Sequence, residues 1–442
     1  MPPRPSACAA WGCAAPARIS RSSRSTSSRK KEAALDTPHP ASRPHSSQGP
    51  LAGYRVLELG STVAGPFCGR LLADFGAEVI KVEPAEGDPV RTMGKRFHGK
   101  SLYAASIFRN KSLISVDLRK PEGQALVRSL AEKCDVLVEN FRPGGMERWG
   151  LGYEALSSIN PGLVMVRISG FGQDGPYAQR AGYGVIGEAV SGLRHLTGDP
   201  DRPPARVAVS MTDYITGLYA AFGATMALLA RGKTGRGQFI DAALYECAFS
   251  FMEPWIPAFE KLGHIANRTG SRLPESTPNN LYATGDGSFI HITAMGEAVF
   301  QRLCEAMGRP ELARDPRFTP ATARSENHED LDDIIGAWTA GKPLEELERI
   351  LEKALVPATR IYTIADIFAD PHYRARGSIA AAPDADFGSV AMAQVVPRLS
   401  LTPGAVRHAG RRVGEDTRAV LTELLGLDAA RLDALQREGV IA

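Results

Sequence analysis

The first half of the chain alternates short apolar runs with segments of helical periodicity. Six runs have the apolar, β-branched character of buried strands, and they span residues 54–60, 77–83, 112–118, 136–140, 163–168 and 237–242. The apolar positions of residues 66–75 and 121–131 instead predict helices between strands. Because strands that alternate with helices form βαβ units, we expect an α/β fold with a Rossmann-like, doubly wound, mostly parallel sheet.

The pattern changes after residue 270, where a proline-containing loop precedes a short strand at 289–292 and amphipathic helices near 299–307 and 344–355. This segment predicts a second, smaller α+β domain. A strand near 391–396 and a helix over 417–425 are expected to rejoin the first domain. The predicted organisation is an N-terminal extension (1–50), the N-terminal part of a large α/β domain (51–245), a linker (246–270), a small domain (271–370), a second linker (371–395) and the C-terminal part of the large domain (396–442).

Composition and charge narrow the class of protein. The chain has 442 residues, of which 43% are hydrophobic, enough for a buried core in more than one domain. Residues 1–50 hold eight Lys and Arg against Glu32 and Asp36, so the net charge of +3 becomes −3 over residues 51–442. The folded part therefore lacks the basic balance of a nucleic-acid-binding protein. The Ser-, Arg-, Pro- and Ala-rich extension has the composition of a transit peptide, and equally that of a disordered start.

Several other kinds of site are not indicated. The longest apolar run, residues 218–230, is shorter than the roughly 18 apolar residues of a transmembrane helix. Six cysteines include no CxxC pair and nine histidines no HxxxH or HExxH, so we expect neither a metal site nor a disulfide framework, and a reducing compartment fits. Residues 170–175 match GxGxxG after a strand, but Pro176 follows and no helix opens there, which argues against a dinucleotide site.

Asp213 is the candidate for chemistry, because of its place beside a predicted helix. A long, nearly uncharged run rich in Ala, Gly and Leu predicts a helix over 214–230. Arg231, Gly232 and Lys233 end it, so that basic side chains lie near the negative end of the dipole and glycine supplies the stop. Asp213 then lies near the positive end, either as an ordinary N-cap or as an ionised, reactive carboxylate. The local sequence leaves both interpretations open.

A set of short motifs in fixed order carries a family resemblance. The motifs are VLEL (56–59), AGP (64–66), GAEVIKVE (76–83), NK (110–111), VENFRPG (138–144), SGFG (169–172) and TGRGQ (234–238). In this order and spacing the chain, from about Leu51 to its C-terminus, resembles the class III CoA-transferases, the superfamily of formyl-CoA transferase, carnitine CoA-transferase and α-methylacyl-CoA racemase. The resemblance places Asp213 at the catalytic aspartate of that family.

The resemblance implies a covalent mechanism of CoA transfer. The Asp213 carboxylate attacks the thioester of a donor acyl-CoA to give a mixed anhydride, and the released CoA thiolate then attacks to leave an aspartyl-CoA thioester. An acceptor carboxylate reverses these steps. A carboxylate nucleophile must stay ionised and accessible, which the positive end of a helix favours. No metal or permanently bound cofactor is implied, and coenzyme A enters only as the thioester substrate.

The resemblance also implies contacts to coenzyme A. Residues at positions corresponding to CoA contacts or to the active site are Val63, Ala64, Val116, Arg119, Asn140, Phe141, Arg142, Arg148 and Tyr183. The first two are expected near the pantetheine, and the residues from Val116 to Arg148 near the nucleotide. Asn140 and Phe141 have a second interpretation, as residues that end a strand and cover the core. Arg142 and Arg148 have one too, as solvated surface charges. Two positions depart from the oxalate branch, with Pro84 in place of Arg and Ala181 in place of Lys.

The acceptor acid is harder to infer from the sequence. The oxalate-using branch carries Gln at the position of Val63, an acidic residue at that of Gly184 and a glycine run where residues 268–274 stand, so oxalate is disfavoured. Arg268 and Arg272, on a loop expected to cover the active site, are candidates for bidentate pairing with a second carboxylate, unless they are simply solvent-exposed. We therefore expect succinyl-CoA as the donor and a dicarboxylic or hydroxy acid as the acceptor.

An alternative function comes from the same superfamily. α-Methylacyl-CoA racemases exchange a proton through an Asp/His pair, and Tyr183 stands at the position of their histidine. A phenol, with an unperturbed pKa near 10, is a poor replacement for imidazole. A non-catalytic CoA-binding paralogue and a lyase are further alternatives.

The family's assembly gives a last set of expectations. Its members are interlocked homodimers, in which each chain forms a ring through which the other passes. We accordingly expect a homodimer that uses acyl-CoA and a carboxylic acid, with no nucleic-acid or membrane partner. A cytoplasmic location fits, or the mitochondrial matrix where residues 1–50 are a transit peptide.

Overall fold

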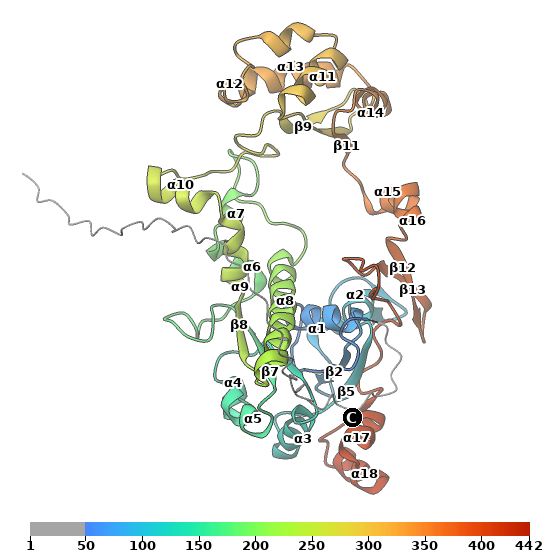
Figure 1. The fold of residues 1–442 in the computed structure, drawn as a ribbon. Coiled ribbons are helices and arrows are strands. Elements are labelled where there is room, and N and C mark those ends of the chain that lie inside the picture. Colours follow the sequence, from blue (N-terminus) through green and yellow to red (C-terminus); the bar gives the residue numbers. More distant parts are fainter. Residues whose placement is uncertain (1–48) are drawn as a thin grey trace, which may run out of the picture. The chain divides into compact units, whose positions relative to one another are not determined.

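Six parallel strands form the central sheet in the computed structural model, which describes residues 49–442 (Figure 1). In spatial order they are β5 (Lys111–Ser115), β2 (Glu78–Glu83), β1 (Arg55–Glu58), β6 (Val136–Glu139), β7 (Val164–Ser169) and β8 (Phe239–Ala243). Counted along the chain this order is 3-2-1-4-5-6, that of a Rossmann-like sheet, in which ligands bind where the order reverses. The α/β prediction is confirmed, and the reversal lies between β1 and β6.

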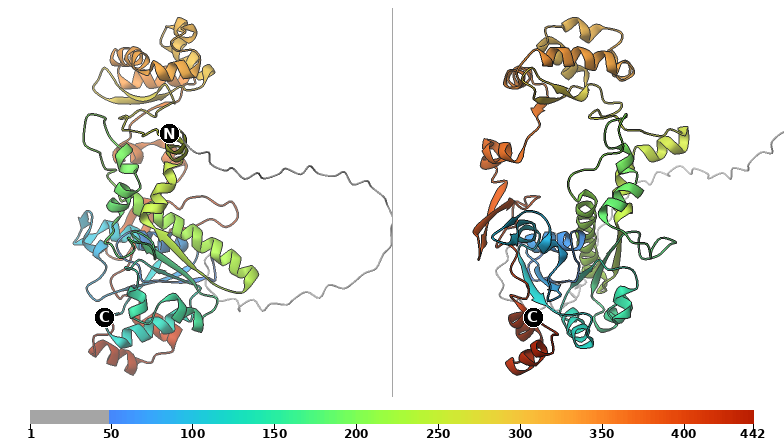
Figure 2. Two further views of the ribbon diagram at one scale, coloured as in Figure 1. Left: turned by 90° about the vertical axis from the view of Figure 1, so that its left-hand side faces the viewer. Right: turned by 180° about the vertical axis from the view of Figure 1, so that it is seen from behind.

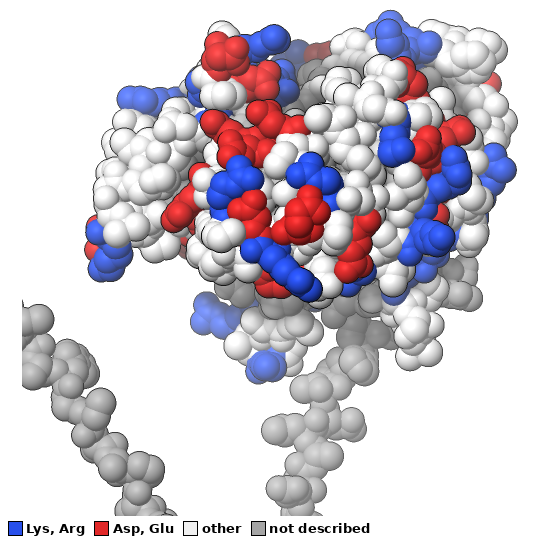
Figure 3. Space-filling view, turned by 90° about the horizontal axis from the view of Figure 1, so that it is seen from above, with Lys and Arg blue, Asp and Glu red and all other residues white. Residues whose placement is uncertain are grey.

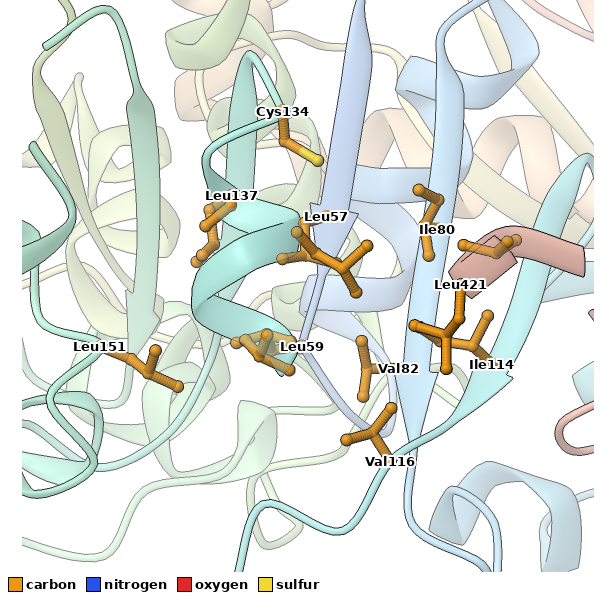
Figure 4. Packing of buried hydrophobic residues seen from close by; sticks show 14 of the residues in the cluster. Leu57, Leu59, Ile80, Val82, Ile114, Val116, Cys134, Leu137, Leu151 and Leu421 are labelled. Carbon is orange, nitrogen blue, oxygen red and sulfur yellow. The ribbon is translucent and has the colours of Figure 1, made fainter. Parts of the chain in front are cut away.

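Alternate side chains of these strands feed two separate cores. On one face Val56 and Val79 pack with helices α1 (Ala64–Asp74) and α8 (Met211–Thr234). On the other, Leu57 and its neighbours pack with α3 (Pro121–Ala131), α5 (Tyr153–Ile159), α17 (Thr417–Leu425) and α18 (Ala429–Arg437). Figure 4 shows the core on this other face, where Leu421 of α17 lies beside the side chains of Ile80 and Ile114. The C-terminal helices therefore cover a sheet that the N-terminal half builds.

Short elements connect the strands and carry much of the site. They are η1 (Pro89–Thr92), β3 (Arg96–Phe97), β4 (Lys100–Ser101), α2 (Leu102–Ile107), α4 (Gly145–Arg148), α6 (Gly184–Val190), α7 (Leu193–Leu196), α9 (Leu244–Phe249), η2 (Ser250–Met252) and α10 (Trp255–Leu262). The span 246–270, expected as a linker, thus contains helical segments including α10. The turned views of Figure 2 show α8 as a long yellow-green helix.

A further core, separate from the two of the central sheet, lies in residues 279–360. Its antiparallel sheet has the order β11 (Ala358–Arg360), β10 (Phe289–Thr293), β9 (Asn279–Ala283). Five helical segments accompany the sheet: α11 (Glu297–Ala306), η3 (Pro310–Arg314), α12 (Ala321–Glu326), α13 (His328–Ala340) and α14 (Leu344–Lys353). Phe300, Leu303 and Leu347 are completely or almost completely buried with the strands. The predicted strand at 289–292 and helix at 344–355 are both present, with small shifts at their ends.

After this further core, the chain continues toward the C-terminal helices of the central sheet. This segment comprises α15 (Ile364–Ala369), α16 (Pro371–Ala375) and a hairpin of β12 (Ile379–Asp384) and β13 (Gly388–Ala393). The strand predicted near 391–396 is therefore β13, which pairs with β12 in a sheet of its own and does not join the central sheet. Packing of Ala382 and Met392 against Ala105 attaches this hairpin to α2.

Two general findings bear on the class of protein. Within residues 49–442, no helix has the length and apolar character needed to cross a bilayer. On the face drawn in Figure 3, acidic and basic side chains are intermixed. The extension predicted for residues 1–50 lies almost wholly outside the described residues.

Candidate active site

Asp213 lies in the first turn of α8, which begins earlier than predicted. The helix runs over Met211–Thr234 and not 214–230, and its N-cap is Ser210. The N-cap interpretation of Asp213 is therefore wrong, because the aspartate is already inside the helix. Arg231 and Lys233 lie in the last turn, and the stop is Gly235 in the left-handed conformation, not Gly232. The placement of Asp213 at the positive end of the dipole is confirmed.

The Asp213 carboxylate lies against the start of α6. A Cβ added to Gly184, the first residue of α6, would be 1.9 Å from Asp213 Oδ2, so only glycine permits this approach. The carboxylate is half-buried, and burial raises its pKa to about 6, against the opposing effects of its own backbone N–H and the Arg206 guanidinium. It makes no ion pair with any side chain of residues 49–442. Asp213 is therefore a poorly compensated carboxylate that is still ionised at neutral pH.

Close packing of α8 on α1 brings Asp213 to the loop after β1. One turn below Asp213, a Cβ at Gly217 would lie 2.8 Å from the Ala64 carbonyl oxygen. Since residues four apart lie on one side of a helix, Asp213 faces the start of α1. Beside it, the Tyr214 ring packs edge-on against Phe67 with ring centres 4.7 Å apart. The structure thus places Asp213 near the predicted pantetheine residues Val63 and Ala64.

The other predicted contacts follow the carboxyl ends of β1, β5 and β6, the edge where a Rossmann-like sheet binds ligands. Asn140 follows β6, and its side chain is used internally: Oδ1 accepts from the Ser61 backbone N–H and Nδ2 donates to the Ser61 carbonyl, each at 2.8 Å. The Phe141 ring packs edge-on against Trp149, with centroids 5.1 Å apart. Asn140 therefore joins the loops of β1 and β6 across the reversal of strand order.

The remaining candidates differ in their exposure to solvent and in whether a protein group already binds them. Val116 is buried in the core, and it forms a backbone bridge with Ile441. Arg119 is exposed and pairs with Asp117. Arg142 and Arg148, in the segment after β6, are also exposed. Tyr183 is 71% exposed and immediately precedes Gly184, so it lies beside the Asp213 carboxylate.

Three features of the site were not predicted. Arg206, seven residues before Asp213, is the guanidinium whose charge acts on it, and nothing in the sequence distinguishes it from a surface arginine. The Tyr103 hydroxyl lies 2.8 Å from that of Tyr214. Tyr103 therefore joins Tyr214 and Phe67 in an aromatic cluster beside Asp213. Arg268, the candidate for pairing with a substrate carboxylate, donates to the backbone carbonyls of His195 and Asp199. Its guanidinium therefore holds the loop that leads to Arg206.

This arrangement has the features of a nucleophilic or basic carboxylate at a ligand-binding sheet edge. Within the described residues, no group of three His, Cys, Asp or Glu side chains forms a candidate metal site. The carboxylate, the adjoining helix start and the glycine-lined approach suit chemistry at a carbonyl carbon.

Comparison with known proteins defines the class. The family model for CoA-transferase family III matches residues 51–417. The chain therefore belongs to CoA-transferase family III and is a CoA-transferase.

Individual relatives narrow the comparison further. Succinyl-CoA–D-citramalate CoA-transferase of Chloroflexus aurantiacus is 50% identical over 394 residues, which are 89% of this chain and 98% of that protein. Succinyl-CoA:glutarate CoA-transferase of Homo sapiens is 35% identical over 396 residues, with 89% and 90% covered. A crystal structure of a CaiB/BaiF family protein from Brucella suis superposes with a TM-score of 0.76 at 36% identity, covering 85% of this chain and 99% of that one.

Proposed function

We propose that this enzyme moves CoA from succinyl-CoA to a dicarboxylic acid through an aspartyl-CoA thioester on Asp213. The observation that carries the proposal is the Asp213 carboxylate itself, which has no ion-pair partner among residues 49–442 and lies beside the start of α1. The substrates are inferred from the relatives, whose names join succinyl-CoA to citramalate, malate or glutarate. All three acceptors are dicarboxylates.

The chemistry balances without an outside reactant. An Asp213 oxygen attacks the thioester carbon of succinyl-CoA and the C–S bond breaks. The products are a succinyl–aspartyl mixed anhydride and the CoA thiolate. The thiolate attacks the aspartyl carbonyl, which releases succinate and leaves aspartyl-CoA. The acceptor carboxylate attacks that carbonyl, and the returning thiolate attacks the acceptor's acyl carbon. Acceptor-CoA is released and Asp213 is again a free carboxylate.

Other residues bind the substrate in this proposal. Val63 and Ala64 contact the pantetheine through backbone groups at the start of α1, since their side chains are buried. Arg142 and Arg148 pair with CoA phosphates, for which exposed guanidinium groups are suited. Arg119 also binds a CoA phosphate in this proposal, and this contact replaces its ion pair with Asp117. Tyr183, beside Gly184, lines the acyl end, and no observation favours the racemase reaction with a phenol in this position.

An uncovered apolar surface supports the proposal of a homodimer. Leu218, Phe222 and Leu229 of α8 are 58–60% exposed, and they recur on one side of the helix. A groove beside it is lined by Phe249, Trp255, Phe259 and other apolar residues of α7, α9 and α10. Large contiguous apolar surfaces mark protein interfaces. A second copy of the chain, interlocked with the first as in the family, is the partner we propose for this surface.

We propose that the enzyme works in a compartment that contains acyl-CoA. This compartment is the cytoplasm, or the mitochondrial matrix if residues 1–50 act as a transit peptide. Detection of the mature N-terminus in a cell fraction distinguishes the two.

Trapping of the intermediate tests the function. The purified enzyme is mixed with succinyl-CoA, treated with hydroxylamine or borohydride, and digested for mass spectrometry. We expect a CoA-dependent modification on the Asp213 peptide that is absent from Asp213→Ala and disappears when citramalate, malate or glutarate is added. No modification, together with α-proton exchange of a 2-methylacyl-CoA in deuterated water, would overturn the proposal in favour of a racemase.

A further inference from the structure

The loop between β1 and α1 contains an unusual backbone conformation. Thr62 has a φ of +67°, in the left-handed region that a β-branched residue rarely occupies. Thr62 directly precedes Val63 and Ala64, which begin α1 beside Asp213. A conformation that the residue itself disfavours persists only when its surroundings hold it.

Asp88 holds Thr62 in this conformation. Its carboxylate accepts the Thr62 backbone N–H at 3.1 and 3.3 Å, and its Oδ1 also accepts the Val90 N–H at 2.9 Å. Lys81 lies behind it, with Nζ 3.0 Å from Asp88 Oδ2 and 2.6 Å from the Gly60 carbonyl oxygen. Asp88 and Lys81 are 3% and 1% exposed, so water does not compete for these contacts.

Two further side chains, those of Asn140 and Lys111, also hold this loop. The Asn140 amide forms two hydrogen bonds with Ser61, and the Lys111 ammonium bonds the Pro66 carbonyl at 2.7 Å. Gly60 and Gly65 approach so closely that a Cβ on either would lie 2.9 Å from the other's Cα. Polar side chains therefore contact the backbone at four positions between residues 60 and 66.

We propose that Asp88, supported by Lys81, is a positioning residue for CoA transfer. This inference rests on the proposed function, because its target is the backbone of Val63 and Ala64. Ala64 meets Gly217, which lies one turn along α8 from Asp213. The hydrogen bonds from Thr62 to Asp88 fix the position of the Val63 and Ala64 backbone groups relative to the bound thioester. The role is separate from substrate contact, since Asp88 is buried and its oxygens already have protein partners.

Three variants test the proposal: Asp88→Ala, Asp88→Ala combined with Thr62→Gly, and Asp416→Asn as the control. Asp416 also uses a carboxylate to accept a backbone N–H, that of Leu113 at 2.8 Å, far along the chain from the loop. Because a displacement of about 1 Å costs up to roughly 100-fold in rate, we expect Asp88→Ala to lower kcat by about 10–100-fold. The KM for succinyl-CoA should change much less, and Asp416→Asn should retain kcat within about twofold.

Glycine at position 62 supplies the decisive rescue. Glycine adopts the left-handed conformation without strain, so the double variant should recover much of kcat although the carboxylate is absent. A purely stabilising role would instead lower the melting temperature of Asp88→Ala, leave kcat unchanged at a permissive temperature, and show no rescue. Either of those kinetic results would overturn the proposal.

Hydrogen exchange separates this inference from the function it rests on. Amides of residues 61–64 should exchange faster in Asp88→Ala than in the wild type. In the double variant the amide of residue 62 should stay fast, because its carboxylate acceptor is still absent. If the wild type transfers no CoA, the proposed function fails, and unchanged exchange then overturns the positioning role as well. If the wild type is active and exchange is unchanged, the positioning role alone fails.

Discussion

The carboxylates at the end of α1 and at the start of α8 are both withdrawn from water, but their surroundings differ. Asp74 receives three hydrogen bonds of 2.9, 3.2 and 2.6 Å from Arg109 and one of 2.7 Å from Asn110. Asp213 has its own backbone N–H and the more distant charge of Arg206. The first carboxylate is fully used in holding the fold together, whereas the second keeps its lone pairs for a substrate. Burial alone does not identify a reactive group; burial without compensation does.

Asp74 also shows what a structural carboxylate connects. Arg109 donates to the carbonyl of Ala393, and Asn110 donates to that of Ala405 and accepts the N–H of Arg407. This network attaches the returning C-terminal segment to the end of α1. Its loss should therefore separate parts of the fold, not stop chemistry.

The largest effect should come from Asp213→Asn. Removing the nucleophile should lower kcat by 10³-fold or more, in line with the loss of other covalent nucleophiles, roughly 10⁴–10⁶-fold. Because the folded-state pKa of Asp213 is raised to about 6, the stability its protonated form contributes is lost as pH rises toward that value. At pH 8 the variant should thus melt no lower than the wild type. Turnover assays and calorimetry measure both, and substantial residual turnover would contradict the nucleophile role.

Asp74→Asn should have the opposite profile. Leaving Arg109 buried without its counter-charge should cost about 3–5 kcal/mol of unfolding free energy. Urea or thermal unfolding measures this loss, while kcat at 25 °C stays within about twofold of the wild type in the folded fraction. A large fall in kcat with unchanged stability would erase the distinction between the two carboxylates.

Gly184→Ala should impair chemistry without unfolding the protein. The added methyl would lie 1.9 Å from Asp213 Oδ2 and must displace the carboxylate. A displacement of about 1 Å is expected to lower kcat by roughly 100-fold. Gly187→Ala is a comparison on the same helix, where the added methyl meets Leu244 and Thr212 instead. Equal kinetic effects of the two variants would show that α6 packing, and not the carboxylate, is responsible.

The pH profile should give the smallest change. A carboxyl with a pKa of about 6 loses its nucleophilic form as pH falls, so kcat/KM should be level above pH 7 and fall about tenfold per unit below pH 6. Steady-state assays from pH 5 to 8 with a constant ionic strength measure it. A profile that stays level down to pH 5 would contradict a raised pKa of Asp213.

Much of the architecture follows from local pattern. Alternating apolar positions such as Val56 and Leu57 predict a sheet covered on both faces, and the helix at 121–131 has the predicted ends. Element ends were less predictable. Residues 211–213 do not extend the Ala-, Gly- and Leu-rich pattern, so the sequence predicts a later start of α8 and allows Asp213 as an N-cap.

The family motifs identify Asp213 and the residues at the sheet edge as candidates, but they do not predict the hydrogen-bond partners of each side chain. The motifs predict that Asn140 contacts CoA, and they do not reveal that its amide also forms two hydrogen bonds with the Ser61 backbone. Asp88 was not singled out at all, because a carboxylate before a proline has no local feature that reveals a distant N–H. Such contacts join residues 26 to 79 positions apart and are invisible to periodicity.

Local sequence and family pattern were thus sufficient for the class of fold, the order of its elements and the identity of the catalytic candidate. These depend on side-chain size and polarity at neighbouring positions, which the chain displays directly. The surroundings that make Asp213 poorly compensated, Asp74 fully paired and Thr62 left-handed arise only on folding. Each depends on groups that long loops bring together, and the energy of a charge is set by those neighbours and by the exclusion of water.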